Sequence, residues 1–196
     1  MQQDLPVMTL DRTRWSLDGG GAPAAFSGDA KGSVRAATCE DMGTVTGIYG
    51  RFVETSTVTS EIRRPSEAEM MARRQTALNR GLPYLVAELE GYVVGFAYAA
   101  QFRPRDGYRL TVEDSIYVRP DCTGYGLGKM LLTELISRCE EHRCHSMVAC
   151  VCGENAASVG LHQSFGFETV GIMPETVFKF GEWLGLTLMQ RRLLRE

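Results

Sequence analysis

The sequence predicts one mixed α/β domain, with a central twisted sheet of about seven mostly antiparallel strands and about four flanking helices. Strand-like runs alternate with segments whose apolar residues recur at helical spacing, and turn residues separate them. The chain of 196 residues is 44% apolar and 23% charged, which is the composition of an ordinary globular protein with one core.

The first three elements are a short strand and two helices. Residues 33–37 are predicted as the strand. Residues 38–54 place apolar side chains at helical spacing after an acidic start, which predicts the first helix. The second helix spans residues 65–81, where a Pro-Ser pair favours the start and a glycine favours the end.

Three strands follow in the middle of the chain. Residues 83–89 and 92–102 are joined across Glu90–Gly91, which predicts a hairpin. Residues 108–120 alternate and stop at a proline, so the side chains of this strand divide between two faces. One face carries Thr111, Glu113, Ser115 and Tyr117, and the other carries Val112, Asp114, Ile116 and Val118.

The C-terminal half begins with a helix and ends with strands. One helical stripe is formed by Leu127, Leu131, Leu135 and Cys139. The later elements are predicted as a strand, a short helix and two further strands, at residues 146–152, 154–166, 167–173 and 184–193.

Composition and charge argue against several classes of protein. The formal net charge of -3 argues against a nucleic-acid-binding protein, which normally presents a basic face. No apolar run reaches the ~18–20 residues that a membrane span needs. Residues 1–32 are rich in Gly, Ala and Ser without periodicity, so they are predicted as a disordered extension before a domain at residues 33–196. The extension lacks a signal-peptide pattern, which indicates a cytoplasmic protein.

A zinc site is the alternative that residues 139–152 raise, because this segment contains four cysteines and two histidines. It has no CxxC pair and crosses from a predicted helix into a predicted strand, unlike the strict spacing of zinc sites. Cys150 and Cys152 share one face of that strand, as small buried side chains do. We therefore expect no metal and, without a secretory signal, no disulfides.

The most informative segment is the glycine run at residues 124–128, which leads directly into the helical stripe. Gly124 and Gly128 are one residue too close together for a Walker loop, so that motif does not match. The dinucleotide-binding fingerprint GxGxxG does not match either, because Lys129 stands at the position of its third glycine. A structural turn is the simpler alternative. Glycine N–H groups can nevertheless converge at a helix N-terminus, where the helix dipole favours an anion such as a pyrophosphate.

Two segments resemble the Gcn5-related N-acetyltransferases (GNAT) in order, spacing and context: "SIYVRPDCTGYGLGKMLL" and "ENAASVGLHQSFGF". The segments "FRPRDGYRLTVEDSIYV" and "FKFGEWLGLTLMQ" bring the chain closer to the phosphinothricin and methionine sulfoximine acetyltransferases of that superfamily. The resemblance covers about residues 33–194. It implies the acyl-CoA N-acyltransferase fold, with acetyl-CoA as the donor and CoA as a product.

The resemblance places the cofactor between a strand end, the glycine loop and the next helix. Backbone groups of Ile116–Val118 would pair with the pantetheine arm, and the loop would take the pyrophosphate. The implied cofactor-binding residues are Ile116, Tyr117, Val118, Thr123, Gly124, Tyr125, Gly126, Leu127, Gly128, Lys129 and Asn155. Thr123 stands where the family usually has Arg or Gln, but its hydroxyl can still donate a hydrogen bond to the cofactor.

Acetyl transfer to an amine needs a base, a donor to the oxyanion and a proton for the departing thiolate. Glu113 is the expected base, because the subgroup has a catalytic glutamate at the corresponding place in "TVEDS". An exposed strand residue is the alternative for this side chain. By the same resemblance, the Val118 N–H would donate to the oxyanion. His162 could protonate the thiolate, or it could be a structural residue of its helix.

Arg103 and Arg105 precede the strand of the expected base. Guanidinium groups can bind a carboxylate or phosphinate through two hydrogen bonds, and the subgroup uses this segment to bind amino-acid analogues. The resemblance therefore implies that at least one of the two arginines binds substrate. Residues 55–61 depart from the pattern of the subgroup, which predicts a reshaped and wider acceptor pocket.

The implied function is transfer of an acetyl group from acetyl-CoA to the primary amine of a small amino acid or analogue, such as phosphinothricin, methionine sulfoximine or methionine sulfone. Acetylation of proteins or peptides, a non-catalytic acyl-CoA-binding module and a zinc-binding interaction protein are the alternatives. An intact Glu113 counts against the non-catalytic module. Similar proteins are commonly homodimers, and no nucleic-acid or membrane partner is expected.

Overall fold

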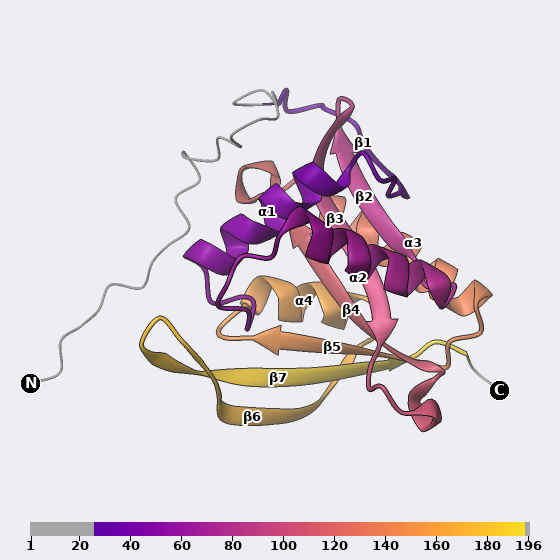
Figure 1. The fold of residues 1–196 in the computed structure, drawn as a ribbon, viewed down its shortest axis with the longest axis vertical. Coiled ribbons are helices and arrows are strands. Elements are labelled where there is room, and N and C mark those ends of the chain that lie inside the picture. Colours follow the sequence, from indigo (N-terminus) through magenta and orange to yellow (C-terminus); the bar gives the residue numbers. More distant parts are fainter. Residues whose placement is uncertain (1–25, 195–196) are drawn as a thin grey trace, which may run out of the picture.

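The computed structural model describes residues 26–194, which fold around a seven-stranded sheet in the order β1-β2-β3-β4-β5-β7-β6 (Figure 1). Neighbouring strands are antiparallel except β4 and β5, which are parallel. The strands are β1 (Gly32–Ala36), β2 (Tyr84–Leu89), β3 (Tyr92–Gln101), β4 (Thr111–Val118), β5 (Ser146–Cys152), β6 (Glu168–Lys179) and β7 (Glu182–Arg192). The helices are α1 (Met42–Thr55), α2 (Glu67–Asn79), α3 (Leu127–Glu141) and α4 (Ala156–Ser164), with the short 3-10 helices η1 (Asp106–Tyr108) and η2 (Pro120–Cys122). The predicted fold class is confirmed.

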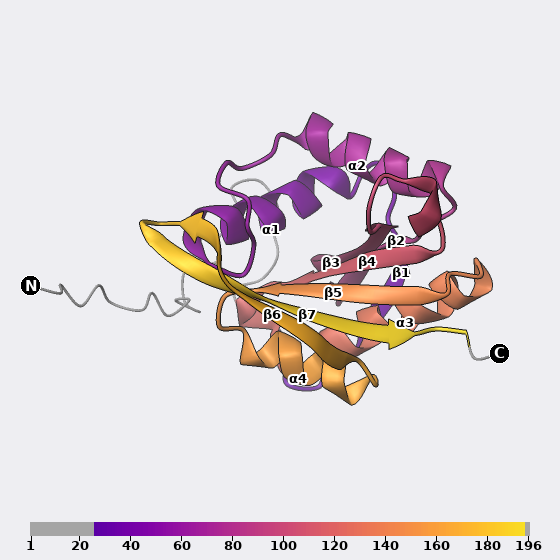
Figure 2. The same cartoon turned by 90° about the horizontal axis from the view of Figure 1, so that it is seen from below.

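Helices cover both faces of the sheet, with α1 and α2 on one face and α3 and α4 on the other (Figure 2). The long helices turn apolar stripes toward the sheet, and the core lies in these two layers. Val45 and Ile48 of α1 are fully buried, as are Leu131 and Leu135 of α3. The helical stripe predicted after the glycine run is therefore confirmed.

Local signals in the sequence fix where elements begin and turn. Ser66 and Glu69 form a capping box at the start of α2: the Ser66 hydroxyl accepts from the Glu69 N–H at 3.2 Å, and the Glu69 carboxylate accepts from the Ser66 N–H at 2.7 Å. The predicted turn at Glu90–Gly91 joins β2 and β3.

The last two strands are longer than predicted. β6 continues past residue 173 to Lys179, and β7 begins at Glu182. The register between the two strands shifts between Met173 and Val177, on either side of Pro174. Most of β6 is also exposed on both faces. The strand therefore lacks the alternation by which its full length could have been predicted.

The predicted N-terminal extension, residues 1–32, is described only from Phe26 onward; residues 1–25 lie outside the described residues. Residues 26–31 form a turn, in which the Ala30 N–H donates to the Ser27 carbonyl at 3.0 Å, and then lead into β1. Among the described helices, none has both the length and the apolar character needed to cross a lipid bilayer.

Candidate active site

β4 and β5 lie side by side over part of their length and then separate. Their parallel pairing joins Thr111–Asp114 of β4 to Ser146–Ala149 of β5. After this point, among the strands of residues 26–194, β4 pairs only with β3, and β5 pairs only with β7. The sheet therefore opens at Asp114 into a wedge between two adjacent strands.

Beyond Asp114, no strand in the described part of the chain pairs with the edge of β4 that faces this wedge. The Arg119 N–H donates to the Val94 carbonyl on the β3 side at 2.9 Å. Because N–H groups alternate along a strand, those of Val118 and Ile116 point to the other side, toward the wedge. A ligand lying in the wedge can therefore pair with β4 as a strand would.

At the open end of β4 the chain enters the glycine loop, residues 123–126, which leads into α3. Gly124 and Gly126 have φ angles of +95° and +76°, and a Cβ on either would meet no atom within 4 Å in the described chain. Gly126 is the N-cap of α3 and supplies no side-chain cap, so the first N–H groups of the helix stay available. Their partial positive charge favours an anion there.

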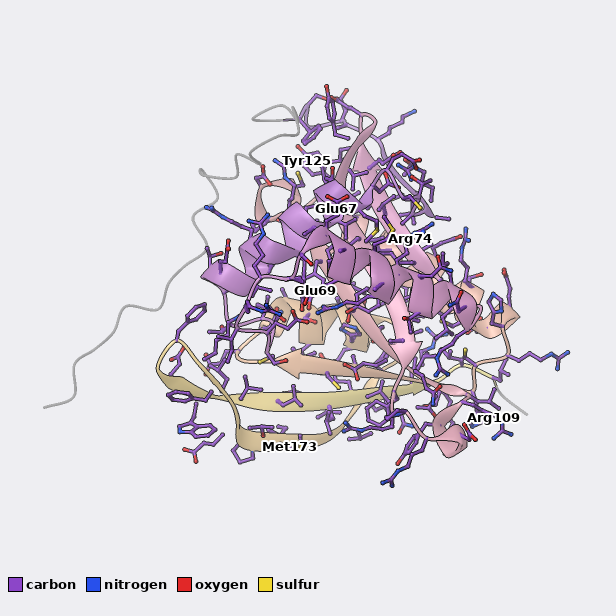
Figure 3. All side chains as sticks on the ribbon, viewed as in Figure 1. Glu67, Glu69, Arg74, Arg109, Tyr125 and Met173 are labelled. Carbon is purple, nitrogen blue, oxygen red and sulfur yellow. The ribbon has the colours of Figure 1, made fainter. Side chains whose placement is uncertain are left out.

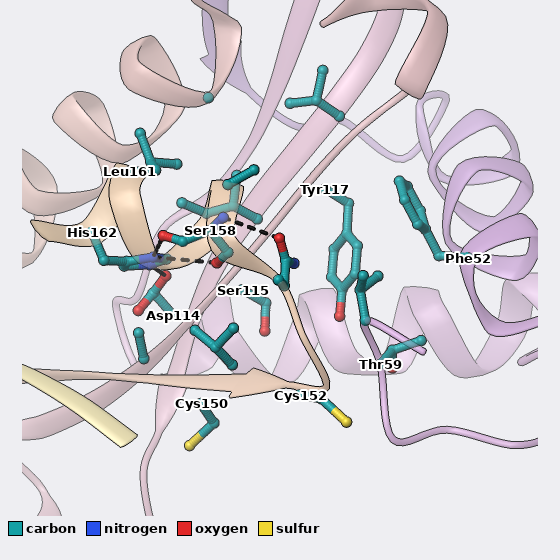
Figure 4. Close-up of a pocket in the computed structure, with 18 of the residues that line it drawn as sticks. Phe52, Thr59, Asp114, Ser115, Tyr117, Cys150, Cys152, Ser158, Leu161 and His162 are labelled. Carbon is teal, nitrogen blue, oxygen red and sulfur yellow. Dashed lines mark hydrogen bonds and ion pairs between the residues drawn. The ribbon is translucent and has the colours of Figure 1, made fainter. Parts of the chain in front are cut away.

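The wedge and the glycine loop open into one cleft of about 1130 Å³, part of which is drawn in Figure 4. The predicted site residues that line it are Arg103, Glu113, Ile116, Tyr117, Val118, Thr123, Gly124, Gly126, Leu127, Gly128, Lys129, Asn155 and His162. Tyr125 and Arg105 are not among its lining residues. The Tyr125 hydroxyl instead donates to the Phe26 carbonyl, and Arg105 is exposed on the loop before β4.

Glu113 lies half-buried beside the point where β4 and β5 separate. Burial raises the pKa of its carboxyl above the usual value. A hydrogen bond from the Cys150 thiol and the charge of Arg103 lower this pKa without cancelling the shift, while Asp114 adds to it. Burial, together with the nearby Glu113, also raises the pKa of Cys150 to about 12. A carboxylate of raised pKa in a cleft is suited to accept a proton.

His162 of α4 is buried, and both of its ring nitrogens meet hydrogen-bond acceptors (Figure 4). Nε2 lies 3.0 Å from Oδ2 of Asp114, and Nδ1 lies 2.7 Å from the Ser158 carbonyl oxygen. Burial alone would lower the pKa of His162, but the hydrogen bond and charge of Asp114, with the Ser158 carbonyl, raise it above the usual value. The imidazolium form, which donates from both nitrogens, is therefore favoured.

Asp114 is the site residue that sequence reasoning missed. Alternation correctly separates it from Glu113, but the opening of the sheet lets both faces of β4 border the cleft. The Asp114 side chain is 1% exposed, and Oδ1 has no hydrogen-bond partner among the described residues. A lone acidic residue on an otherwise apolar face was the only signal, since the partner His162 lies 48 residues later.

The segment between α1 and α2 lines one side of the cleft. Buried Thr59 joins two elements: its hydroxyl is 3.0 Å from the Tyr49 hydroxyl of α1, and its carbonyl accepts from Lys179 Nζ of β6 at 2.9 Å. The Tyr49 ring packs edge-on against Tyr117 of β4, with ring centroids 4.9 Å apart. Phe52 completes this wall.

Arg103 reaches the cleft from the loop between β3 and η1, with its guanidinium 4.7 Å from the centre of the Phe102 ring. Gln101 holds this loop, because its Nε2 donates to the carbonyls of Arg103 at 2.6 Å and Arg105 at 3.1 Å. Arg80, at the end of α2, donates to Oε1 of Gln101. The position of Arg103 thus depends on the end of α2.

The cysteine-rich segment packs into the core. All six cysteines are unpaired, and Cys139 and Cys144 hydrogen-bond to each other. Within residues 26–194, no group of three or more His, Cys, Asp or Glu side chains is arranged to hold a metal ion.

Comparison with known proteins identifies the family. The model of the acetyltransferase (GNAT) family matches residues 51–167, more than half of the chain. The chain is 44% identical over 162 residues to a phosphinothricin N-acetyltransferase of Alcaligenes faecalis, covering 82% of each protein. It is 42% identical over 162 residues to an L-methionine sulfoximine/L-methionine sulfone acetyltransferase of Pseudomonas aeruginosa, covering 82% of this chain and 94% of that protein.

A solved structure leads to the same family. A GNAT phosphinothricin acetyltransferase from Sinorhizobium meliloti, in complex with acetyl-CoA, matches with a TM-score of 0.80 at 44% identity, covering 83% of this chain and 88% of that one. The expected enzyme class, an acetyl-CoA-dependent N-acetyltransferase, is confirmed. The chain belongs to the acetyltransferase (GNAT) family.

Proposed function

We propose that the protein acetylates the primary amine of a small amino acid or amino-acid analogue of the phosphinothricin, methionine sulfoximine or methionine sulfone kind. The names and identities of the two curated relatives support this substrate class. The observation that carries the proposal is Glu113, a half-buried carboxylate of raised pKa beside the opening between β4 and β5. It borders the same cleft as the glycine loop.

The cleft fits acetyl-CoA, which supplies an acetyl group activated as a thioester. The unpaired edge of β4 at Ile116 and Val118 is suited to the amide groups of the pantetheine arm. Gly124 and Gly126 carry no side chains, so a ligand can approach the backbone of the glycine loop closely. The loop also leads to the N-terminus of α3, and both features suit the diphosphate. Thr123, at the start of the glycine loop, and Asn155, the N-cap of α4, also line the cleft.

Glu113 acts as the general base in this proposal. An amine whose pKa is near ~10 is protonated at neutral pH and cannot attack until it loses a proton. The raised pKa of Glu113 makes its carboxylate a stronger acceptor for that proton than an exposed glutamate. The N–H of Val118, directed into the wedge, would donate to the oxyanion.

His162 is the proposed proton donor to the departing thiolate, and its contacts set a condition on that role. Nε2 is hydrogen-bonded to Asp114, so the ring must turn away from this carboxylate before Nε2–H can reach a sulfur atom. Loss of the proton would then leave a neutral imidazole beside Asp114. If the ring stays in place, the pair instead holds α4 against β4.

Arg103 is the proposed contact for the carboxylate or phosphinate of the acceptor, because it lines the cleft near Glu113. Arg105 stays a weaker prediction, since it is exposed beyond the lining of the cleft.

We also propose a homodimer, supported by exposed apolar side chains on β6 and β7. We further propose a cytoplasmic location, where acetyl-CoA is available.

The test is a Glu113→Gln variant, assayed for acetyl-CoA turnover across pH with a panel of amines that includes phosphinothricin, methionine sulfoximine and methionine sulfone. Loss of a general base predicts a fall of about 10²–10⁴-fold in kcat/KM, with CoA affinity unchanged. Glu182→Gln, an exposed carboxylate on β7, is the matched control. Wild-type rates in Glu113→Gln with the best amine would refute the base, and turnover of peptides alone would refute the substrate class.

A further inference from the structure

Residues Phe26–Gly32, here the N-terminal segment, contact the glycine loop through Tyr125. The Tyr125 hydroxyl donates to the Phe26 carbonyl at 3.2 Å, which joins residues 99 positions apart. Tyr125 lies at the end of the molecule where the described chain begins (Figure 3). Its side chain therefore binds the N-terminal segment instead of lining the cleft.

A second contact lies at the other end of the N-terminal segment. A Cβ placed on Gly32 would come within 2.7 Å of Cδ2 of Leu127 and 3.3 Å of Sδ of Met130. Leu127 is the first residue of α3, is buried, and lines the cleft. The segment thus contacts both the glycine loop and the first turn of the helix that follows it.

The N-terminal segment is itself held by the hairpin of β2 and β3. The Phe26 ring meets the Tyr92 ring edge-on, with centroids 6.3 Å apart. The Ser27 hydroxyl donates to Oε1 of Glu90 at 3.3 Å, and the turn closes through the Ala30 N–H. Because β2 and β3 lie inside the sheet, they offer a fixed support for the segment.

Within the described residues, two side-chain hydrogen bonds hold the glycine loop: the Thr123 hydroxyl donates to the Pro120 carbonyl at 2.9 Å, and the Tyr125 hydroxyl donates to Phe26. Gly124 and Gly126 carry no side chains, adopt left-handed backbone conformations, and provide no side-chain cap for α3. Ordering such a loop around an anion costs backbone entropy at the moment of binding. Contacts that hold the loop beforehand reduce this cost.

We infer that the N-terminal segment pre-orders the glycine loop for the diphosphate of coenzyme A, with Tyr125 as the connecting residue. The segment lies before residue 33, where the resemblance to the family begins. The inference rests on the proposed diphosphate site. Tyr125 is accordingly a positioning residue, which acts on the cofactor through the loop.

The first test removes only the connecting hydroxyl, with Tyr125→Phe. The Kd for CoA, measured by calorimetry, and the KM for acetyl-CoA are expected to rise about three- to tenfold, the effect of one lost hydrogen bond. The KM for the amine is expected to stay unchanged. Tyr92→Phe is the matched control, because it removes a hydroxyl with no hydrogen-bond partner among the described residues and keeps the ring against Phe26. A Tyr125→Phe protein with wild-type Kd would overturn the inference.

A double-mutant cycle tests whether Tyr125 acts through the segment. Phe26→Ala removes the ring that anchors the segment to Tyr92 and is expected to weaken CoA binding by a similar factor. If Tyr125 and Phe26 both act by holding the N-terminal segment against the loop, the double variant loses little more CoA affinity than either single variant. Fully additive losses would show that Tyr125 acts on the cofactor independently, and would contradict the inference.

Gly126 separates failure of this inference from failure of the proposed cofactor site. Gly126→Asp places a carboxylate at the diphosphate site and is expected to lower CoA affinity at least tenfold more than Gly126→Asn, which has nearly the same shape without the charge. Equal affinities of these two variants would refute the diphosphate site, and the inference with it. A charge effect at Gly126 with no effect of Tyr125→Phe or Phe26→Ala would refute the role of the segment alone.

Discussion

At the scale of single residues, neighbouring groups shift the pKa of Glu113 in opposite directions. Burial and Asp114 raise the pKa of its carboxyl, while the Cys150 thiol and Arg103 lower it. As the proposed base, Glu113 must be deprotonated to accept a proton from the amine, so the rate is expected to rise with pH through the pKa of Glu113. The charge of Arg103 is therefore expected to affect the pH dependence of the rate as well as the proposed acceptor binding.

Replacing Arg103 with Gln removes a cation that favours the carboxylate of Glu113. The acidic limb of the kcat/KM profile is expected to move to higher pH, because the pKa of Glu113 rises further when the positive charge is lost. The KM for an acceptor that carries a carboxylate or phosphinate is also expected to rise. Arg109→Gln, on an exposed arginine outside the cleft lining, is the control. An acidic limb that stays in place or moves to lower pH in Arg103→Gln would contradict this account of Glu113.

At the scale of elements, one buried ion pair fastens α4 to β4 where β4 leaves β5. His162 and Asp114 are both buried, and their contact lies beside the point where the sheet opens. Since the folded-state pKa of His162 is raised, the pair stabilises the protein fully below the unfolded-state pKa of about 6.5. The stabilisation is lost as pH rises through the raised folded-state pKa.

His162→Asn is expected to be most destabilising below about pH 6.5, and less destabilising as pH increases beyond the folded-state pKa. Urea unfolding of wild type and variant over a series of pH values measures the difference. Asp114→Asn leaves a buried imidazolium without its counter-charge and is expected to cost roughly 3–5 kcal/mol at acidic pH. His145→Asn, on an exposed histidine, serves as control. A wild-type-to-His162→Asn difference that does not vary with pH would show that the pair is not ionised.

At the scale of the whole molecule, β6 forms an edge of the sheet and carries much of the exposed apolar surface. The exposed large apolar side chains of β6, β7 and their turn are Val170, Ile172, Met173, Phe178, Phe180 and Trp183. Met173 marks this outer edge in Figure 3. An edge strand with such side chains is typical of a surface that pairs with another chain.

Trp183→Lys tests the proposed homodimer through this surface. Light scattering after size-exclusion chromatography is expected to give the wild type twice the chain mass of 21.7 kDa and the variant a single chain mass. A charge on Trp183, which is 60% exposed, would disfavour burial against a second copy. Ile62→Lys is the control, because Ile62 is 75% exposed and belongs to the segment between α1 and α2. A monomeric wild type at micromolar concentration would refute the proposal.

Much of the fold and site follows from local sequence, whereas the remaining features depend on long-range packing. Alternation in β4 placed Glu113 on its face, and the glycine spacing predicted an anion site at the start of a helix. The partnership of Asp114 with His162 could not be predicted, because it requires α4 to pack where two strands separate. The contacts of Thr59 likewise depend on the meeting of α1 and β6. The direction of Tyr125, away from the cleft, depends on a segment 99 positions earlier.

A crystal structure with bound coenzyme A tests the central claim most directly. The account predicts the diphosphate within hydrogen-bond distance of N–H groups in residues 124–129, and pantetheine amides paired with the free edge of Ile116 and Val118. Coenzyme A bound elsewhere, with protein side chains filling the glycine loop and the wedge between β4 and β5, would contradict it.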